Sequence, residues 1–314
     1  MINLKSRRGF IKLGALGTAA TVLPFSQLTG NAKKEELVRV GVIGTGNRGM
    51  GLIDLINSID GLEVVACADV IPFRLEVGLA QAEKAKGYTN HADLLGDKNV
   101  DAVLICTPFS MHGQMAIDAL QAGKHVYCEK TMVKGVPEIQ AVIDQYRKSD
   151  LVFQTGHQYH SSALYNKTRQ IIQSGYIGDV TAIHCQWNRN GSWRRPVPDP
   201  KWERMINWRM YLEYSGGLVA ELMSHQIDFI NWVTQSLPSH FTGFGGIDHW
   251  KDGRETYDNV HLLMKYPSGL DASLTCTTTN GYDDYKIKIL GSRATIIMDY
   301  ANELSTWKKW VRRK

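Results

Sequence analysis

The stretch VRVGVIGTGNRGMGLIDLI, residues 38–56, decides the fold of this chain. It opens with a short apolar run, residues 38–43, which is rich in β-branched side chains and typical of a buried parallel strand. A turn with the pattern G-x-G-x-x-G follows, and leucines and isoleucines at helical spacing come after the turn. This order of strand, glycine-rich turn and helix is typical of the first unit of a doubly wound α/β sheet.

Each glycine of the turn has a physical role. Gly44 allows the tight bend, Gly46 lets the backbone approach a pyrophosphate, and Gly49 lets the helix pack closely on the strand. The free N–H groups and the positive dipole of the helix N-terminus then face the phosphates. We therefore expect the whole turn to bind a dinucleotide through Gly44, Thr45, Gly46, Asn47, Arg48 and Gly49.

An acidic residue lies near the end of the next predicted strand, residues 62–70. Asp69 comes 20 residues after the third glycine, where a carboxylate can meet the hydroxyls of the adenosine ribose. A carboxylate there repels a 2′-phosphate, so the sequence favours NAD over NADP. Arg74 lies nearby and leaves NADP as the alternative.

Strands and helices continue to alternate after this unit. Apolar runs predict strands at 100–108, 125–130 and 152–157, with helices at 110–122 and 135–148 between them. Ligands of such sheets gather at the carboxyl ends of the strands. The candidate residues at those ends are Thr107, Pro108, Glu129, Lys130 and His157. We predict a dinucleotide-binding Rossmann domain over residues 36–157 and a substrate and oligomerisation domain over residues 158–314.

The first 32 residues predict an export signal instead of part of the fold. The segment SRRGFIK, residues 6–12, resembles the twin-arginine pattern S-R-R-x-F-[LI]-K. The apolar run behind it, residues 13–23, is shorter than the roughly 20 residues that a membrane span needs. We expect the twin-arginine machinery to export the protein to the periplasm with its cofactor already bound, and we expect no transmembrane anchor.

Charge and cysteine content exclude other classes of protein. The formal charge is +5 for the whole chain, and basic clusters at both ends leave about −4 on residues 33–307. Such a body offers no basic face to a nucleic acid. The five cysteines are Cys67, Cys106, Cys128, Cys185 and Cys276. None lies in CxxC or metal-ligand spacing, so we predict no metal site.

Four segments together resemble the Gfo/Idh/MocA oxidoreductases over roughly residues 36–300. They are GVIGTGNRG, ADVIPFR, DAVLICTPFSMHGQMAIDALQAGKHVYCEK and GGLVAELMSHQIDF. That family includes glucose–fructose oxidoreductase and inositol dehydrogenase. The resemblance implies an α/β protein: an N-terminal Rossmann domain followed by a C-terminal α/β domain with an open, mostly antiparallel sheet. It also implies a homo-oligomer, and hydride transfer between a carbon of a sugar or polyol and a nicotinamide.

The resemblance also assigns roles to individual residues. Lys130 matches the lysine of the family's E-K-P motif, between cofactor and substrate, and His112 belongs to the block that precedes it. His225 matches the histidine of the D-x-x-x-H motif, which contacts the reacting hydroxyl. Two departures matter: Thr131 replaces a proline that often follows a cis peptide bond, and Glu221 replaces the aspartate. Relatives also continue beyond residues 296–298, so the second domain is expected to be shortened.

The chemistry of these side chains suits the oxidation of an alcohol. His225 is expected to act as the base because the ordinary pKa of histidine is near neutrality. Lys130 can stabilise the developing alkoxide. Glu221 precedes His225 by four residues on a helix predicted over residues 218–233, so we expect it to orient the imidazole. His157 is either a substrate contact or a structural residue.

The segment 187–217 combines four tryptophans with five arginines and is too irregular for one helix or strand. Tryptophan faces stack on sugar rings, and arginines donate to hydroxyls or carboxylates. We expect substrate or subunit contacts from Trp193, Arg194, Trp208 and Arg209; the alternative is a packed arm at a subunit interface.

Two other functions remain open at this point. One is a glycoside hydrolase resembling family 109, which would use NAD transiently to eliminate a leaving group. The other is a non-catalytic protein that binds NAD or sugar. The main expectation is an exported NAD-dependent dehydrogenase acting on a hydroxyl of a carbohydrate substrate.

Overall fold

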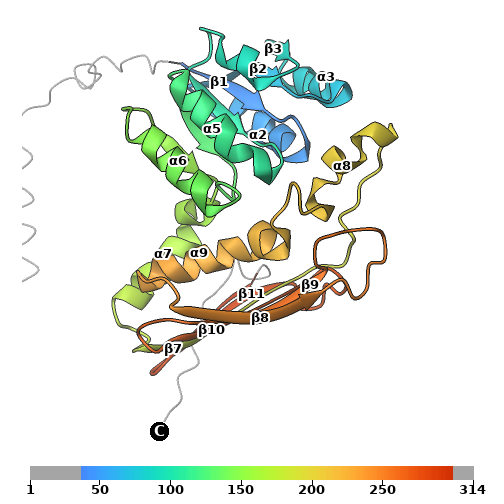
Figure 1. The fold of residues 1–314 in the computed structure, drawn as a ribbon. Helices are drawn as coiled ribbons and strands as arrows, with labels where there is room; N and C mark the ends of the chain where they lie inside the picture. Colours follow the sequence, from blue (N-terminus) through green and yellow to red (C-terminus); the bar gives the residue numbers. More distant parts are fainter. Residues whose placement is uncertain (1–36, 300–314) are drawn as a thin grey trace, which may run out of the picture. The chain divides into compact units, whose positions relative to one another are not determined.

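A six-stranded parallel sheet forms the first half of the described chain (Figure 1). The computed structural model describes residues 37–299. The strands lie in the order β3-β2-β1-β4-β5-β6, and every neighbouring pair is parallel. The strands are β1 (Val38–Ile43), β2 (Leu62–Ala68), β3 (Lys86–Tyr88), β4 (Ala102–Ile105), β5 (His125–Cys128) and β6 (Phe153–Thr155). This is the doubly wound sheet that the glycine-rich turn predicts.

Helices cover both faces of this sheet because neighbouring residues of a strand point to opposite sides. Val42 packs in one apolar cluster with residues of the first helix, whereas Ile43 packs in a second cluster on the other face. The helices are α2 (Asn47–Asn57), α3 (Pro72–Gln81), α4 (His91–Leu95), α5 (His112–Gln121) and α6 (Val136–Tyr146). A 3₁₀ turn, Phe109–Met111, leads into α5.

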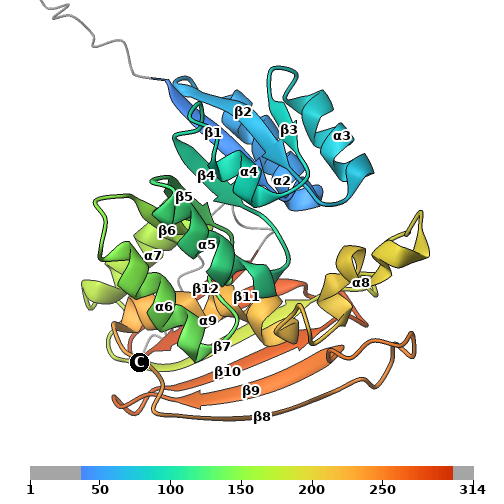
Figure 2. The same ribbon diagram turned by 45° about the horizontal axis from the view of Figure 1, so that its top comes forward.

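The second half contains a mixed sheet with the order β12-β11-β7-β10-β9-β8 (Figure 2). Its strands are β7 (Val180–Asn188), β8 (His240–Gly246), β9 (Asn259–Lys265), β10 (Asp271–Thr277), β11 (Tyr285–Gly291) and β12 (Thr295–Asp299). Only the pair β7–β10 is parallel among the described strands of this sheet. Two helices, α7 (Ala163–Gln173) and α9 (Ser224–Thr234), bury their apolar sides against one face. The predicted α/β fold class, with a mostly antiparallel second sheet, is confirmed.

The arginine- and tryptophan-rich segment between β7 and α9 forms no long element, as expected. It contains the short helix α8 (Glu203–Ile206) and the 3₁₀ turns Pro200–Trp202 and Trp208–Met210. The helix predicted over residues 218–233 is present, but it begins with a π-helical turn, Val219–Met223, before α9. That turn carries Glu221.

The glycine-rich turn is closed by contacts that leave no room for side chains. The backbone of Gly44 has φ +91°, and a Cβ at Gly49 would lie 2.0 Å from the carbonyl oxygen of Gly44. Helix α2 therefore rests directly on the turn, which confirms the close packing expected at Gly49.

The predicted export signal, residues 1–32, lies outside the described residues. Within residues 37–299, no helix combines the length and the apolar character that a membrane crossing requires.

Candidate active site

A cavity of about 860 Å³ lies beyond the carboxyl ends of β1, β2, β4 and β5. Residues of both halves of the chain line it, so the second domain completes the site that the first begins. The residues predicted from the sequence that line it are Gly44, Gly46, Asn47, Arg48, Asp69, Arg74, Thr107, Pro108, His112, Glu129, Lys130, Trp193, Trp208, Arg209, Glu221 and His225. Four other predicted residues, Thr45, Gly49, His157 and Arg194, are not part of its lining.

The start of α2 has the shape and the free donors that a pyrophosphate needs. The helix begins after Gly46 with no side-chain cap, so its first N–H groups are left for another partner. A Cβ at Gly44 would lie 2.9 Å from the backbone of Cys106, so the turn lies directly against the loop after β4. These features of the turn fit a dinucleotide.

Asp69 and Arg74 stand beside this turn. The Asp69 carboxylate accepts hydrogen bonds from the backbone N–H groups of Thr45 and Ile71, each at 2.9 Å. Thr45 thus supports the acid from a fully buried position instead of facing the cavity. The Arg74 guanidinium lies 3.6 Å from where a Cβ of Gly46 would be, close to the phosphate-binding turn.

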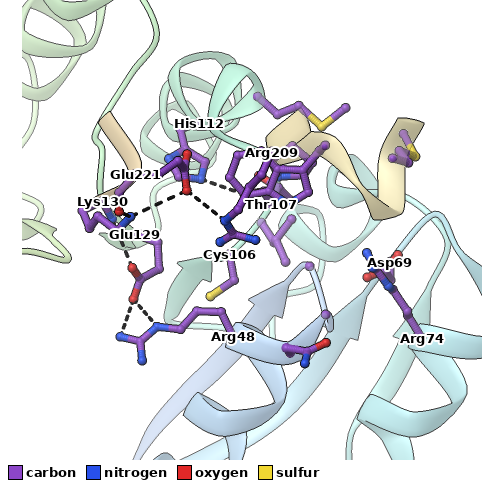
Figure 3. A pocket seen from close by; sticks show the side chains of 18 of the residues that line it. Arg48, Asp69, Arg74, Cys106, Thr107, His112, Glu129, Lys130, Arg209 and Glu221 are labelled. Atoms are coloured by element: carbon purple, nitrogen blue, oxygen red, sulfur yellow. Dashed lines mark hydrogen bonds and ion pairs between the residues drawn. The ribbon is translucent and has the colours of Figure 1, made fainter. Parts of the chain in front are cut away.

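An ion pair joins the glycine-rich turn to the loop after β5 (Figure 3). Arg48 Nε donates to Glu129 Oε1 at 2.7 Å, and Glu129 is largely buried. Glu129 is next to Lys130 in the chain, so this pair fixes the position of Lys130 relative to α2.

Lys130 is held by the π-helical turn of the second domain. Its Nζ donates to the carbonyl oxygen of Glu221 at 2.6 Å and lies 3.8 Å from Glu221 Oε2. Arg209 Nε donates to the same carboxylate oxygen at 3.0 Å (Figure 3). Burial lowers the pKa of Lys130, and the charge of Glu221 opposes this shift.

His225 lies among aromatic rings, 5.0 Å from Tyr159 and 5.6 Å from Trp187 between ring centroids. Its Nδ1 is buried and has no hydrogen-bond partner within the part of the chain that the structure describes. Burial, followed by the positive charge of Lys130, lowers the pKa of His225 to about 3. The ring is therefore neutral near pH 7.

Glu221 does not orient His225, contrary to the expectation from their spacing. Its carboxylate is bound by Arg209 and lies beside Lys130. The π-helical turn that begins the helix alters the backbone register between the two residues, and the cations of the site take up the carboxylate.

His112 connects the loop after β4 with the loop after β5 through its two ring nitrogens. Its Nδ1 lies 2.9 Å from the carbonyl oxygen of Thr131 and its Nε2 lies 3.0 Å from that of Thr107. Burial lowers the pKa of this ring. The peptide bond between Lys130 and Thr131 is cis, although Thr131 stands where the family motif has proline.

His157, predicted as a substrate contact or a structural residue, and Arg194, predicted as a substrate or subunit contact, do not line this cavity. The His157 ring lies 5.7 Å from the ring of His225. Arg194 pairs with Glu203 and Asp252, and so holds the loop together. Its neighbour Arg195 lines the cavity instead.

Sequence reasoning missed several side chains that line the cavity. They include Tyr159, Tyr165, Trp187, Arg189 and Arg195. Trp187 and Arg189 are two residues apart at the end of β7. Because residues two apart in a strand point to the same side, identifying one of them as a cavity residue would have predicted the other.

Comparisons with known proteins agree with this geometry. Residues 38–157 match the model of the oxidoreductase family with an NAD-binding Rossmann fold, and residues 165–297 match that of the GFO/IDH/MocA C-terminal domain. Myo-inositol 2-dehydrogenase of Thermotoga maritima is 25% identical over 272 residues, which cover 85% of this chain and 76% of that protein. The 2,7-anhydro-N-acetylneuraminate hydratase of Escherichia coli is 25% identical over 265 residues, covering 84% and 68%.

The fold is also similar to solved structures. The WlbA dehydrogenase of Bordetella pertussis, solved with NADH and UDP-GlcNAcA, gives a TM-score of 0.76 at 22% identity, covering 89% of this chain and 79% of that one. The two family models together account for both sheets and for all three residues Lys130, Glu221 and His225. The chain therefore belongs to the Gfo/Idh/MocA family of oxidoreductases, which carry an NAD-binding Rossmann domain.

Proposed function

We propose that the protein oxidises a hydroxyl-bearing carbon of a sugar, glycoside or polyol, with hydride transfer to the nicotinamide of NAD. The observation that carries this proposal is the meeting of Lys130 and His225, from the two domains, in the cavity that the glycine-rich turn also lines. The similarity to a protein named myo-inositol 2-dehydrogenase supports a polyol or sugar as the substrate.

The cofactor supplies the hydride acceptor. Gly46 and the N-terminus of α2 would hold its pyrophosphate, and Asp69 would meet the adenosine ribose. The Asp69 carboxylate would repel the 2′-phosphate of NADP and so favours NAD. Arg74 is the residue that would pair with a 2′-phosphate if NADP were bound.

The side chains provide the proton chemistry. His225 accepts the hydroxyl proton in this proposal, because it lines the cavity and its Nδ1 lacks a partner among the described residues. Lys130 stabilises the negative charge that develops on the substrate oxygen. Glu221 and Arg209 hold Lys130 in place from the second domain.

A screen of sugars and polyols tests this function. Purified protein is incubated with NAD or NADP, and NADH formation is followed by absorbance at the nicotinamide band. The proposal predicts turnover that is lost in His225→Ala and Lys130→Ala. Turnover that persists in both variants would contradict the site assignment.

A second candidate is a reaction without net oxidation, because one relative is named a hydratase. Here the same residues would oxidise a sugar carbon transiently, allow a neighbouring group to be eliminated, and support the addition of water before the hydride is returned. Nitrophenyl glycosides separate the two functions. Release of nitrophenol without NADH supports the second candidate, whereas NADH and a ketosugar without release support the dehydrogenase.

We also propose that residues 1–32 direct export through the twin-arginine pathway to the periplasm. The support is the segment SRRGFIK and the short apolar run behind it. A protein exported after folding could carry its cofactor with it, and purified protein would then release nicotinamide dinucleotide on acid extraction.

A further inference from the structure

The cavity carries more positive charge than its cofactor requires. Six cationic side chains line it, namely Arg48, Arg74, Lys130, Arg189, Arg195 and Arg209. Three carboxylates line it, namely Asp69, Glu129 and Glu221. The formal excess is three positive charges, whereas residues 33–307 as a whole carry about −4. The positive charge is thus concentrated at the site.

The three carboxylates are already engaged. Glu129 forms an ion pair with Arg48, and Glu221 forms ion pairs with both Lys130 and Arg209. Asp69 accepts hydrogen bonds from backbone N–H groups. Throughout residues 37–299, no carboxylate lies within 4.0 Å of the guanidinium groups of the other three cations, Arg74, Arg189 and Arg195.

Arg189 and Arg209 lie next to the reacting residues. The Arg189 guanidinium lies over the ring of Trp187, 5.4 Å from its centroid, and Trp187 in turn packs beside His225. Arg209 lies over Trp208 at 4.2 Å and contacts Glu221 through Nε alone, so its two terminal nitrogens are left for another partner.

Arg195 also lines the cavity and lies near Arg74, which stands beside the glycine-rich turn. Burial lowers the pKa of Arg74, the charge of Asp69 opposes this shift, and the charges of Arg195 and Arg209 add to it, so both of these arginines lie near Arg74. Arginines that repel one another across a cavity are stabilised by an anion between them.

NAD cannot neutralise this group by itself. Its two phosphates and cationic nicotinamide leave one net negative charge, and its pyrophosphate would be held at the glycine-rich turn. About two positive charges then remain on the cavity as a whole.

We propose that the substrate is an anionic sugar, whose carboxylate, sulfate or phosphate group is bound by Arg189 and Arg195 together with the terminal nitrogens of Arg209. Planar guanidinium groups bind such oxyanions through paired hydrogen bonds. This assignment rests on the proposed function and narrows its substrate class.

The test compares acidic sugars with their neutral parents. Binding to the NAD-loaded protein is measured by titration calorimetry for glucuronate, galacturonate, glucose 6-phosphate and glucose 6-sulfate, and for glucose and galactose. At least one acid is expected to bind tenfold or more tightly than its parent, since a charge-assisted hydrogen bond contributes this much or more. The preference should weaken at high salt.

The variants Arg189→Gln and Arg195→Gln should each reduce this preference. Arg147→Gln is the matched control, because it removes the same charge from an exposed residue at the end of α6, outside the cavity lining. The carboxylate, sulfate and phosphate ligands show which oxyanion the arginines select.

Three results would overturn the proposal. In the first, no acidic sugar binds more tightly than its neutral parent. In the second, the preference survives in both variants. In the third, the variants weaken only the binding of NADP, which would assign the arginines to a 2′-phosphate. If an acidic sugar binds with the expected selectivity but no sugar is turned over, the proposed oxidation fails while the charge selectivity stands.

Discussion

The ring of His225 is about 5% exposed, and the aromatic side chains around it exclude water from the point where a proton would be accepted. Replacing it with alanine should lower turnover by roughly 10²–10⁴, the usual contribution of a general base. NAD affinity should change little, because the proposed cofactor contacts of the glycine-rich turn lie in the other domain. Steady-state kinetics and NADH fluorescence titration measure the two effects. A large loss of NAD binding would count against this placement of His225.

The burial of His225 also makes stability depend on pH. Its folded pKa of about 3 lies below the value of about 6.5 for an exposed histidine, so the unfolded chain binds the proton more readily between these pH values. The residue therefore costs no stability above about pH 7 and increasingly opposes folding as the pH falls toward 3. At pH 5 the cost is about 2 kcal/mol.

Urea unfolding at pH 7 and pH 5 measures this cost. The difference in unfolding free energy between the two pH values should shrink by about 2 kcal/mol in His225→Asn. It should stay the same in His261→Asn, whose ring is exposed on β9. An equal pH dependence in wild type and His225→Asn would contradict the burial argument.

Glu221 should act with Lys130 and Arg209 instead of with His225. The effects of Glu221→Gln and His225→Ala on turnover should multiply, because the carboxylate contacts the cations and not the imidazole. Glu221→Gln and Arg209→Gln should be strongly non-additive, because either change breaks the same ion pair. Double-mutant cycles on kcat distinguish the two cases, and a coupled Glu221–His225 pair would refute the first.

At the scale of elements, the contact between α2 and the glycine-rich turn gives a matched pair of substitutions. Gly49→Ala should abolish NAD binding and destabilise the protein by about 1–3 kcal/mol, because its Cβ would overlap the carbonyl oxygen of Gly44. Gly51→Ala lies in the same helix with nothing within 4 Å of the added carbon. It should leave NAD binding intact and stabilise the helix by up to about 1 kcal/mol. NADH titration and urea unfolding of both variants check this, and equal behaviour of the two would contradict it.

Elements with a strong apolar pattern were predictable from the sequence, and the others were not. The strands β1, β2, β4 and β5 are short apolar runs and were found within a few residues of their observed bounds. Helix α3 was missed because its apolar residues Leu75 and Leu79 are only partly buried, and Gly78 is its one fully buried residue. Strand β3 has three residues and none is buried.

The site was predictable as a set of residues but not as a set of contacts. Motifs identified Lys130, Glu221 and His225, but the partner of Glu221 depends on Arg209, which lies in an irregular loop. That Arg195 lines the cavity and Arg194 does not was unpredictable for the same reason. The path of the loop decides which of two adjacent arginines faces the cavity. An irregular loop has no periodic sequence pattern from which that path could be predicted.

At the scale of the whole molecule, the proposed export makes a separate prediction. Replacing Arg7 and Arg8 together by lysine should leave the protein in the cytoplasm, because the paired arginines are the feature that the pathway recognises. Cell fractionation followed by immunoblotting measures the outcome. NADH formation by the retained protein serves as the control for folding, and normal export of the variant would show that residues 1–32 use another route or none.

The π-helical turn Val219–Met223 has a consequence for how this scaffold can change over time. Such a turn holds one residue more than an α-helix needs over the same length, which in genetic terms corresponds to one inserted codon. Deleting the codon of Leu222 would let the α-helix run unbroken into α9 and would rotate Glu221 by about 100° relative to His225. The carboxylate would then leave the cations that it now bridges. A one-codon deletion would thus change the contacts of Glu221 in a single step, whereas point substitutions in the helix would leave its backbone register in place.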